Sequence, residues 1–319
     1  LLQFVARLRE LSGGKPVGFK LAIGHPWEWF GIAKAMQETG LLPDFIVVDG
    51  AEGGTGAAPA EFVDHVGVPM HEALLLVHNT LVGLDLRERI RIGAAGKITS
   101  AFEIARTIAL GADWCNAGRG FMFALGCIQS LRCHTDKCPT GIATQNPARW
   151  KHLDAPDKAT RVHSYHEHTL HALKELLCAA GLNDPAELGP EHILRRVSPV
   201  EIRSLASLYR YLEPGELLHK VPDHAVFHSF WAEARSDSFQ PPPRIQALRA
   251  SKSRSRLCRV EPCSTAFVER REVEQARLYG EASCISGPAQ PTTWPSCGPC
   301  AHAACATPQA ALNRPSPSR

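Results

Sequence analysis

The sequence lacks any apolar run that approaches the roughly 20 residues of a membrane-spanning helix. Its first ten residues, "LLQFVARLRE", lack both a starting Met and the charged, apolar and small-residue regions of a signal peptide. We therefore expect no membrane association and no secretion signal here, and these residues read like the interior of a longer chain.

Most of the chain carries no excess of positive charge, although the net charge of the whole chain is +3. Residues 235–319 hold 12 Lys and Arg against 6 Asp and Glu, whereas the residues before them hold 23 against 26. Because binding to nucleic acid depends on a basic surface, the slightly acidic main body gives no reason to expect a nucleic-acid partner.

The eleven cysteines do not have the even number and regular placement of a disulfide framework. With 319 residues, the chain is also much longer than the small secreted domains that depend on disulfides. We therefore expect a protein of the reducing cytoplasm, whose cysteines serve metal or redox chemistry.

The first part of the chain alternates short apolar runs with helical patterns. We expect strands within 16–24, 43–54, 90–98 and 113–127, and helices over 26–40, 69–86 and 100–112. Such alternation predicts βαβ units and an α/β fold with a parallel sheet. About four units are present, whereas a closed TIM-type (β/α)8 barrel needs eight.

The second part of the chain reads first as helices and then as an irregular tail. Residues 159–182 predict a long helix that ends at Gly181, and residues 198–212 predict another, with Ser198 as its N-cap. From residue 235 the sequence is rich in Pro, Ser, Arg and Cys and has no sustained period. We therefore divide the chain into a folded part, 1–234, and a disordered or non-native tail, 235–319.

Three glycine-rich turns follow the expected strands. "DGAEGGTGAAP" at 49–59 contains the carboxylate of Glu52, and its glycines let backbone N–H groups approach a ligand. "GAAGKI" at 93–98 and "NAGRG" at 116–120 carry Lys97 and Arg119. Two such turns in consecutive βα units favour a phosphate-bearing cofactor over plain flexible turns.

Lys20 lies within the apolar segment "GFKLAIG". A lysine in such a strand either points outward as a solvated charge or projects at the end of the strand that faces a ligand. Because parallel sheets bury both of their faces, the second reading is favoured. Its ammonium group would suit an anionic flavin ring or a substrate carboxylate.

Cys127, Cys133 and Cys138 follow the last of these turns. Three thiolates suit an iron–sulfur cluster of the 3Fe–4S type, with one ligand for each iron. Zinc with His134 as a fourth ligand is a rival, although His134 adjoins Cys133 and is awkward for tetrahedral geometry. Ordinary core thiols are the third possibility, and the spacing alone leaves all three open.

Residues 13–215 resemble the C-terminal half of the FMN-binding synthase domain of the glutamate synthase family. Several separate motifs carry the resemblance in the family's order: "GKPVGFKLAIG", "VVDGAEGGTGAAP", "IRIGAAGKI", "ALGADWCNAGRGFMFALGC" and "CHTDKCPTGIATQ". The resemblance implies half of a (β/α)8 barrel, with FMN and a 3Fe–4S cluster as cofactors.

The resemblance also implies roles for individual residues. Lys20 and Glu52 match catalytic positions, and Lys20 also lies near the flavin. The remaining FMN-binding positions match Gly53, Gly54, Thr55, Gly93, Gly96, Lys97, Gly118 and Arg119. The cluster ligands match Cys127, Cys133 and Cys138.

The implied reaction is the reductive amination of 2-oxoglutarate with ammonia. Reduced FMN donates hydride to 2-iminoglutarate, which gives L-glutamate. The cluster relays electrons from a ferredoxin or from a pyridine-nucleotide-linked reductase. The alternatives are an inactive fragment without cofactor and a related FMN oxidoreductase that acts on another oxo-acid or imine.

Overall fold

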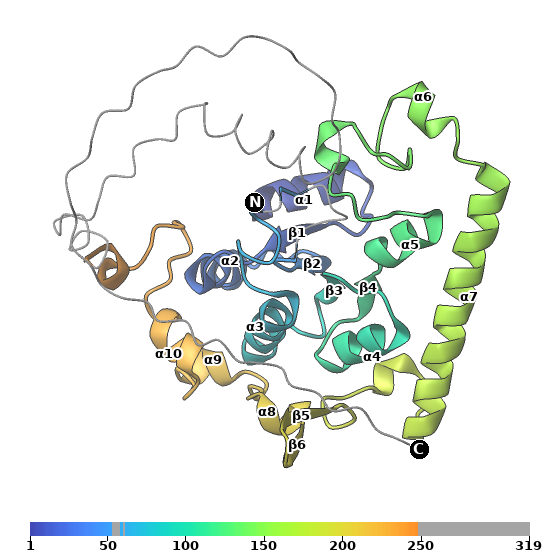
Figure 1. Cartoon of the computed structure of the whole chain (residues 1–319). Helices are drawn as coiled ribbons and strands as arrows, with labels where there is room; N and C mark the ends of the chain where they lie inside the picture. Colours follow the sequence, from blue (N-terminus) through green and yellow to red (C-terminus); the bar gives the residue numbers. More distant parts are fainter. Residues whose placement is uncertain (53–57, 60, 248–319) are drawn as a thin grey trace, which may run out of the picture. The chain divides into compact units, whose positions relative to one another are not determined.

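A four-stranded parallel sheet forms the centre of the computed structural model, which describes residues 1–52, 58–59 and 61–247 (Figure 1). The strands lie side by side in chain order: β1 (Gly18–Ala22), β2 (Phe45–Asp49), β3 (Arg91–Ala95) and β4 (Trp114–Asn116). All three strand pairs are parallel. The expected α/β fold with a parallel sheet is therefore confirmed.

Helices connect the strands and continue after the sheet. They are α1 (Leu2–Leu11), α2 (Pro26–Thr39), α3 (Met70–Gly83), α4 (Ala101–Ala109), α5 (Gly118–Leu125), α6 (Pro147–Trp150), α7 (Ala155–Ala180), α8 (Leu205–Leu208), α9 (Glu216–His219) and α10 (Ala225–Phe230). Two short 3₁₀ helices, η1 (Cys133–Thr135) and η2 (Pro185–Glu187), lie between them. Helix α3 packs on β2 and β3, α4 packs on β4, and α7 runs along α4 and α5 (Figure 1).

One face of the sheet packs against these helices. Alternate residues of a strand point to opposite faces, and the alternate set Ile46, Val48, Ile92 and Ala94 is fully buried. These side chains belong to one apolar core with the buried residues of α2, α3 and α4. Burial on this face holds the four strand ends, and the turns that follow them, in fixed positions.

The opposite face of the sheet is more open. Lys20, Ala22 and Asn116 are exposed on it. The rings of Phe45 and Trp114 meet edge to face on it, with centroids 5.9 Å apart. Polar and charged side chains therefore have room on this face near the strand ends.

The helix ends follow the signals read from the sequence. Helix α2 ends before Gly40, and α7 ends before Gly181; both glycines adopt the left-handed conformation. Ser100 caps α4, because its hydroxyl accepts a hydrogen bond from the N–H of Glu103. The expected helices 26–40, 100–112 and 159–182 are thus confirmed, with the observed bounds given above.

The helix expected over 198–212 is wrong. Residues 194–204 instead form an antiparallel hairpin of β5 (Leu194–Ser198) and β6 (Glu201–Ser204), and only the short helix α8 follows it. Pro199 is the second residue of the turn between the two strands, a position whose φ angle proline already has. Three residues of the segment, Val197, Val200 and Ile202, are β-branched and favour strands. The reverse difference occurs at α5, which is a helix where the sequence led us to expect only a glycine turn.

Part of the expected tail lies within the described residues. Residues 235–247 contact α2: Trp27 Nε1 donates to the carbonyl oxygen of Phe239 at 3.3 Å, and Ser236 donates to Glu38 at 2.5 Å. Residues 248–319 lie outside the described residues. The division at 234 and 235 therefore stays a prediction.

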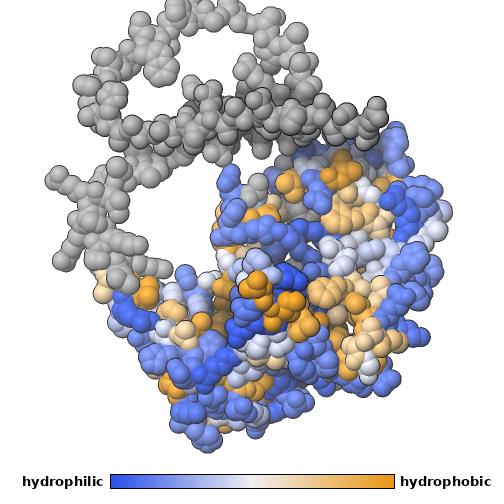
Figure 2. All heavy atoms as spheres, turned by 60° about the horizontal axis from the view of Figure 1, so that its bottom comes forward, coloured by the Kyte–Doolittle hydropathy of each residue, from blue (hydrophilic) through white to orange (hydrophobic). Residues whose placement is uncertain are grey.

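The surface carries mainly polar side chains with apolar ones between them, as one face of the molecule shows (Figure 2). Single apolar residues such as Val200 and Ile128 are exposed, which is ordinary for a folded protein. Among the described residues, no helix is both long and apolar enough to cross a membrane.

Candidate functional site

The turns expected to bind a ligand meet at one edge of the sheet. Because β1 to β4 are parallel, their carboxyl ends point to the same edge, where ligands bind in α/β folds. The segments after β2, β3 and β4 carry Glu52, Lys97 and Arg119. A hydrogen bond joins two of these segments, since Arg119 Nη2 donates to the carbonyl oxygen of Glu52 at 3.4 Å.

Lys20 reaches this edge from β1. Its Nζ lies 2.7 Å from Oδ2 of Asp49, the last residue of β2. Lys20 pairs in register with Val47, and Ala22 pairs with Asp49, so the lysine side chain extends toward the carboxyl end of the sheet. The ammonium group remains on the open face, with 56% of the side chain exposed.

Glu52 caps α3. Its Oε1 accepts a hydrogen bond from the backbone N–H of Met70 at 3.0 Å, at the end of the helix where a negative charge is favoured. Its Oε2 is buried and has no hydrogen-bond partner among the described residues. A Cβ atom on Gly96 would lie 2.6 Å from this oxygen, so Gly96 leaves room for the carboxylate.

Lys97 forms an ion pair with Asp64. Its Nζ donates to both carboxylate oxygens, at 2.5 and 2.6 Å. The hydrogen bond from Lys97 lowers the pKa of Asp64, and the nearby Arg119 lowers it further. The carboxylate therefore lies among cationic side chains at the turn where a phosphate was expected.

The predicted glycines differ in their surroundings. Gly93 lies within β3, where a Cβ atom would collide with the indole of Trp114. Gly118 is the first residue of α5. Gly53, Gly54 and Thr55 lie outside the described residues. The roles expected for all of these residues stay predictions.

The three cysteines of the expected cluster influence one another. The pKa of Cys133 is raised mainly by burial and further by the proximity of Cys127 and Cys138. Burial alone would raise the pKa of Cys138, but that pKa is lowered by hydrogen bonds from the Thr140 hydroxyl and the backbone N–H groups of residues 140, 142 and 143. These donors favour the thiolate form that metal sites require.

The loop that carries these cysteines is closed by hydrogen bonds. The carboxylate of Asp136 accepts from the backbone N–H of Gln145 at 2.7 Å, and the Thr144 hydroxyl donates to the carbonyl oxygen of Asp136 at 2.7 Å. The hydrogen bond from Gln145 is the main cause of the lowered pKa of the Asp136 carboxyl group, and the Thr144 side chain lowers it further. Among the described residues, no three His, Cys, Asp or Glu side chains are arranged to hold a metal ion. The ligand set expected from the sequence therefore stays a prediction.

Two residues of this edge were not identified from the sequence. Asp49 was quoted only as the start of a glycine-rich turn, and Asp64 lies in a segment without a motif. A carboxylate at the carboxyl end of a buried strand could have suggested Asp49. Nothing in the spacing of Asp64 and Lys97, which are 33 residues apart, indicates that they meet.

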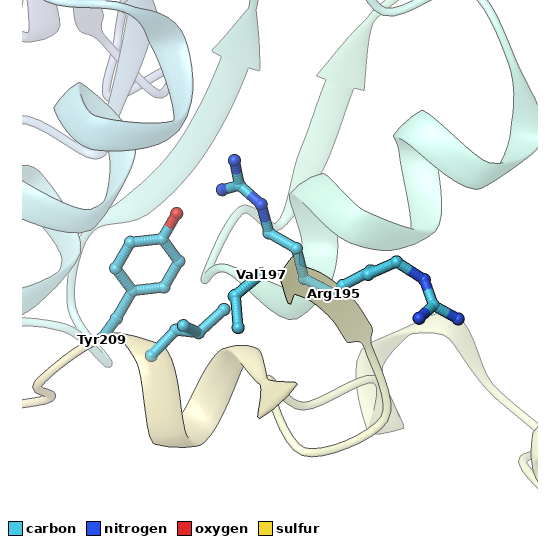
Figure 3. Close-up of a pocket in the computed structure, with 5 residues that line it drawn as sticks. Arg195, Val197 and Tyr209 are labelled. Atoms are coloured by element: carbon cyan, nitrogen blue, oxygen red, sulfur yellow. The ribbon is translucent and has the colours of Figure 1, made fainter. Parts of the chain in front are cut away.

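Two hollows are present in the part of the chain that the structure describes, and neither is lined by Lys20, Glu52, Lys97 or Arg119. One, of about 330 Å³, lies at the carboxyl end of β1 and the start of α2, and its lining includes Ile23, His25, Trp29 and Phe239. Another, of about 250 Å³, lies at the β5–β6 hairpin and is lined by Arg195, Arg196, Val197, Leu208 and Tyr209 (Figure 3). We take the site from the converging charged groups rather than from these shallow hollows.

Comparison with known proteins identifies relatives of most of the described region. Residues 1–183 match the family model described as a conserved region in glutamate synthase. The chain is 42% identical over 208 residues to the glutamate synthase large subunit-like protein YerD of Bacillus subtilis strain 168, covering 65% of this chain and 39% of the relative. It is 41% identical over 184 residues to the archaeal glutamate synthase (NADPH) of Methanocaldococcus jannaschii, covering 57% and 35%.

The chain thus spans well under half the length of these relatives. Among solved structures, a flavocytochrome b2 with sulfite bound overlaps 74% of this chain and 44% of that chain, with a TM-score of 0.38 and 13% identity. A score this low does not establish a common fold.

Proposed function

This chain belongs to the glutamate synthase family, and from this we propose that its sheet is the C-terminal half of a TIM-type (β/α)8 barrel. Four parallel strands in chain order support this proposal. So does the packing of helices against the face that carries Ile46, Val48, Ile92 and Ala94, because the strands of such a barrel turn their other face toward the barrel axis.

We further propose that this half-barrel contributes to an oxidoreductase that converts 2-oxoglutarate and ammonia to L-glutamate. The observation that carries the proposal is the meeting of Lys20, Glu52, Lys97 and Arg119 at the carboxyl edge of the sheet. A cofactor with a phosphate and a dianionic oxo-acid both require cations at such an edge.

The residues present fit FMN. Lys97 and Arg119 follow consecutive strands, as the phosphate site of a barrel requires. Together with Gly93, Gly96 and Gly118, they would bind the phosphate group of FMN. When bound, FMN would supply the hydride chemistry. Gly53, Gly54 and Thr55 complete the proposed flavin contacts.

Lys20 and Glu52 have different proposed tasks. Lys20 would exchange its bond to Asp49 for a carboxylate of the oxo-acid or for the anionic edge of the flavin, since its ammonium group is already on the open face. The bond from Met70 to Glu52 would hold the Glu52 side chain in place, and its second carboxylate oxygen would face the reacting groups.

Cys127, Cys133 and Cys138 would hold a 3Fe–4S cluster as thiolates. Two observations support this ligand set: the pKa of Cys138 is lowered, which favours its thiolate, and the effect of Cys127 and Cys138 on Cys133 indicates that the three thiols lie near one another. The electrons would come from a ferredoxin or from a pyridine-nucleotide-linked reductase.

Flavin titration tests the phosphate site. We expect the full chain to quench the fluorescence of FMN on binding and to bind riboflavin, which lacks the phosphate, at least tenfold more weakly. The Lys97→Ala variant should lose most of this difference, because an ionic hydrogen bond to the phosphate contributes about 1.5–3 kcal/mol. Lys151→Ala, which removes an exposed lysine outside the proposed site, is the matched control.

Two results would contradict the proposal. One is equal binding of FMN and riboflavin, and the other is an FMN affinity that Lys97→Ala leaves unchanged. If FMN binds as expected, glutamate formed from 2-oxoglutarate and ammonia with a chemical reductant tests the substrate.

A further inference from the structure

We infer that Asp64 is an internal anion that occupies the cationic turn in place of a phosphate and thereby weakens cofactor binding. The inference rests on the proposed function, because it takes the ligand of Lys97 to be a phosphate group. Beyond that function, Asp64 would limit the affinity for the cofactor, because its carboxylate competes with the phosphate for Lys97.

The contact between Asp64 and Lys97 has the form expected of an anion-binding site. Both carboxylate oxygens of Asp64 accept from one Nζ, at 2.5 and 2.6 Å. Two neighbouring phosphate oxygens could occupy the same positions, since carboxylate and phosphate present similar acceptors to a cation. The ammonium group therefore cannot bind both anions in this way at the same time.

The backbone holds the two partners in place. Asp64 and Lys97 both adopt positive φ angles, +65° and +47°, in the region that favours glycine and is uncommon for other residues. The N–H of Asp64 donates to the carbonyl oxygen of Ala51 at 2.6 Å, and the N–H of Ala51 donates to that of Val68 at 3.1 Å. These bonds fasten the Asp64 segment across the end of β2.

The charges around Asp64 favour its ionised form. The pKa of Asp64 is lowered first by the hydrogen bond from Lys97 and then by the charges of Lys97, Arg119 and His65. At neutral pH the carboxylate therefore neutralises part of the positive potential that would attract a phosphate. An incoming phosphate must displace it from Lys97.

The exposure of the pair sets the size of the effect. The side chains of Lys97 and Asp64 are 40% and 46% exposed, and exposed ion pairs are weak. Removal of the carboxylate should therefore tighten phosphate binding by roughly two- to fivefold.

The test is a titration of the full chain with FMN, riboflavin and inorganic phosphate. Asp64→Asn removes the charge and keeps a residue that tolerates a positive φ angle. We expect it to bind FMN and phosphate two- to fivefold more tightly than the wild type and to leave riboflavin binding unchanged. Asp64→Gly, which suits the backbone angle better still, provides a second removal of the carboxylate if the first variant does not fold.

Asp85→Asn is the matched control. Asp85 is exposed and also adopts a positive φ angle, +58°. It follows α3 at the end away from Met70, about 20 Å along a helix of this length. The control should reproduce the change in net charge without changing FMN or phosphate affinity.

The outcomes separate the inference from the proposed function. Unchanged or weaker FMN binding by both Asp64 variants, with FMN still dependent on Lys97, would overturn the inference and leave the proposed function intact. Tighter phosphate binding by the variants without FMN binding would support the inference and contradict the proposed function. Absence of both FMN and phosphate binding in all variants would overturn the two together.

Discussion

Single residues at the carboxyl edge of the sheet are already paired in the chain itself. Lys20 bonds Asp49, Lys97 bonds Asp64, and Glu52 bonds the start of α3. Each of these charged side chains already has an oppositely charged or hydrogen-bonding partner within the chain. A ligand that binds at this edge would therefore have to replace that partner. Both lysines were expected from the sequence, but neither carboxylate partner was, because an ion pair between distant segments leaves no local pattern.

The cysteines give a prediction at the residue scale. After anaerobic reconstitution with iron and sulfide, we expect Cys133→Ser to lose most of the bound iron and the broad visible absorption, because a hydroxyl is a poor substitute for a thiolate ligand. The measurement is iron content per chain together with the absorption spectrum.

Cys178→Ser is the control for this experiment, because Cys178 is exposed on α7, far along the sequence from the cysteine loop. Unchanged iron in Cys133→Ser would show that the ligand assignment is wrong. Circular dichroism of both variants should match the wild type, since Cys133 does not belong to the buried apolar core.

Among the elements, α3 contains a largely buried histidine, His78, that couples stability to pH. Burial lowers the pKa of His78 from 6.5 to about 4, and the neighbouring Arg87 adds to this. His78 is therefore neutral in the folded chain, whereas the unfolded chain binds a proton near pH 6.5. The stabilising contribution is complete above pH 6.5 and is lost as the pH falls toward 4.

We expect the free energy of unfolding of the wild type to fall between pH 7 and pH 5 by about 2 kcal/mol more than that of His78→Gln. Urea unfolding at the two pH values measures this difference. His168→Gln, at an exposed position on α7, should behave like the wild type. A pH dependence that His78→Gln leaves unaltered would assign the effect to other groups.

The elements also show which parts of the fold could be read from the sequence. The ends of helices could be predicted where a single residue determines them. Gly40 and Gly181 end their helices in the left-handed conformation, and Ser100 caps the start of α4. The hairpin at 194–204 was missed because a helical pattern and a short strand pattern overlap in this segment, and pairing between the two strands decides the outcome. Helix α5 was missed because its glycines suggested only a turn.

At the scale of the whole molecule, the alternation of strands and helices was enough to predict a parallel sheet. The convergence of glycine-rich turns at one edge followed from that prediction. What the alternation could not predict is how residues beyond 234 pack. Ser236 donates to the carboxylate of Glu38 at 2.5 Å, and Ile245 packs against the apolar core.

Truncation tests this packing. A chain that ends at residue 234 should unfold with a free energy about 2 kcal/mol lower than one that ends at 247. The shorter chain loses the hydrogen bond from Trp27 to Phe239 and the apolar contact of Ile245. Thermal unfolding of both chains gives the comparison, and equal stabilities would mean that residues 235–247 add nothing to the fold.

The close approach of Trp114 to Gly93 has an optical consequence. Because β3 has no side chain at Gly93, the indole lies across the strand on the open face and meets Phe45. Trp114 is the first residue of β4, on the same face of the sheet as Lys20. Its fluorescence emission overlaps the absorption of a flavin, so resonance energy transfer from this indole would report occupancy of the edge without any added label.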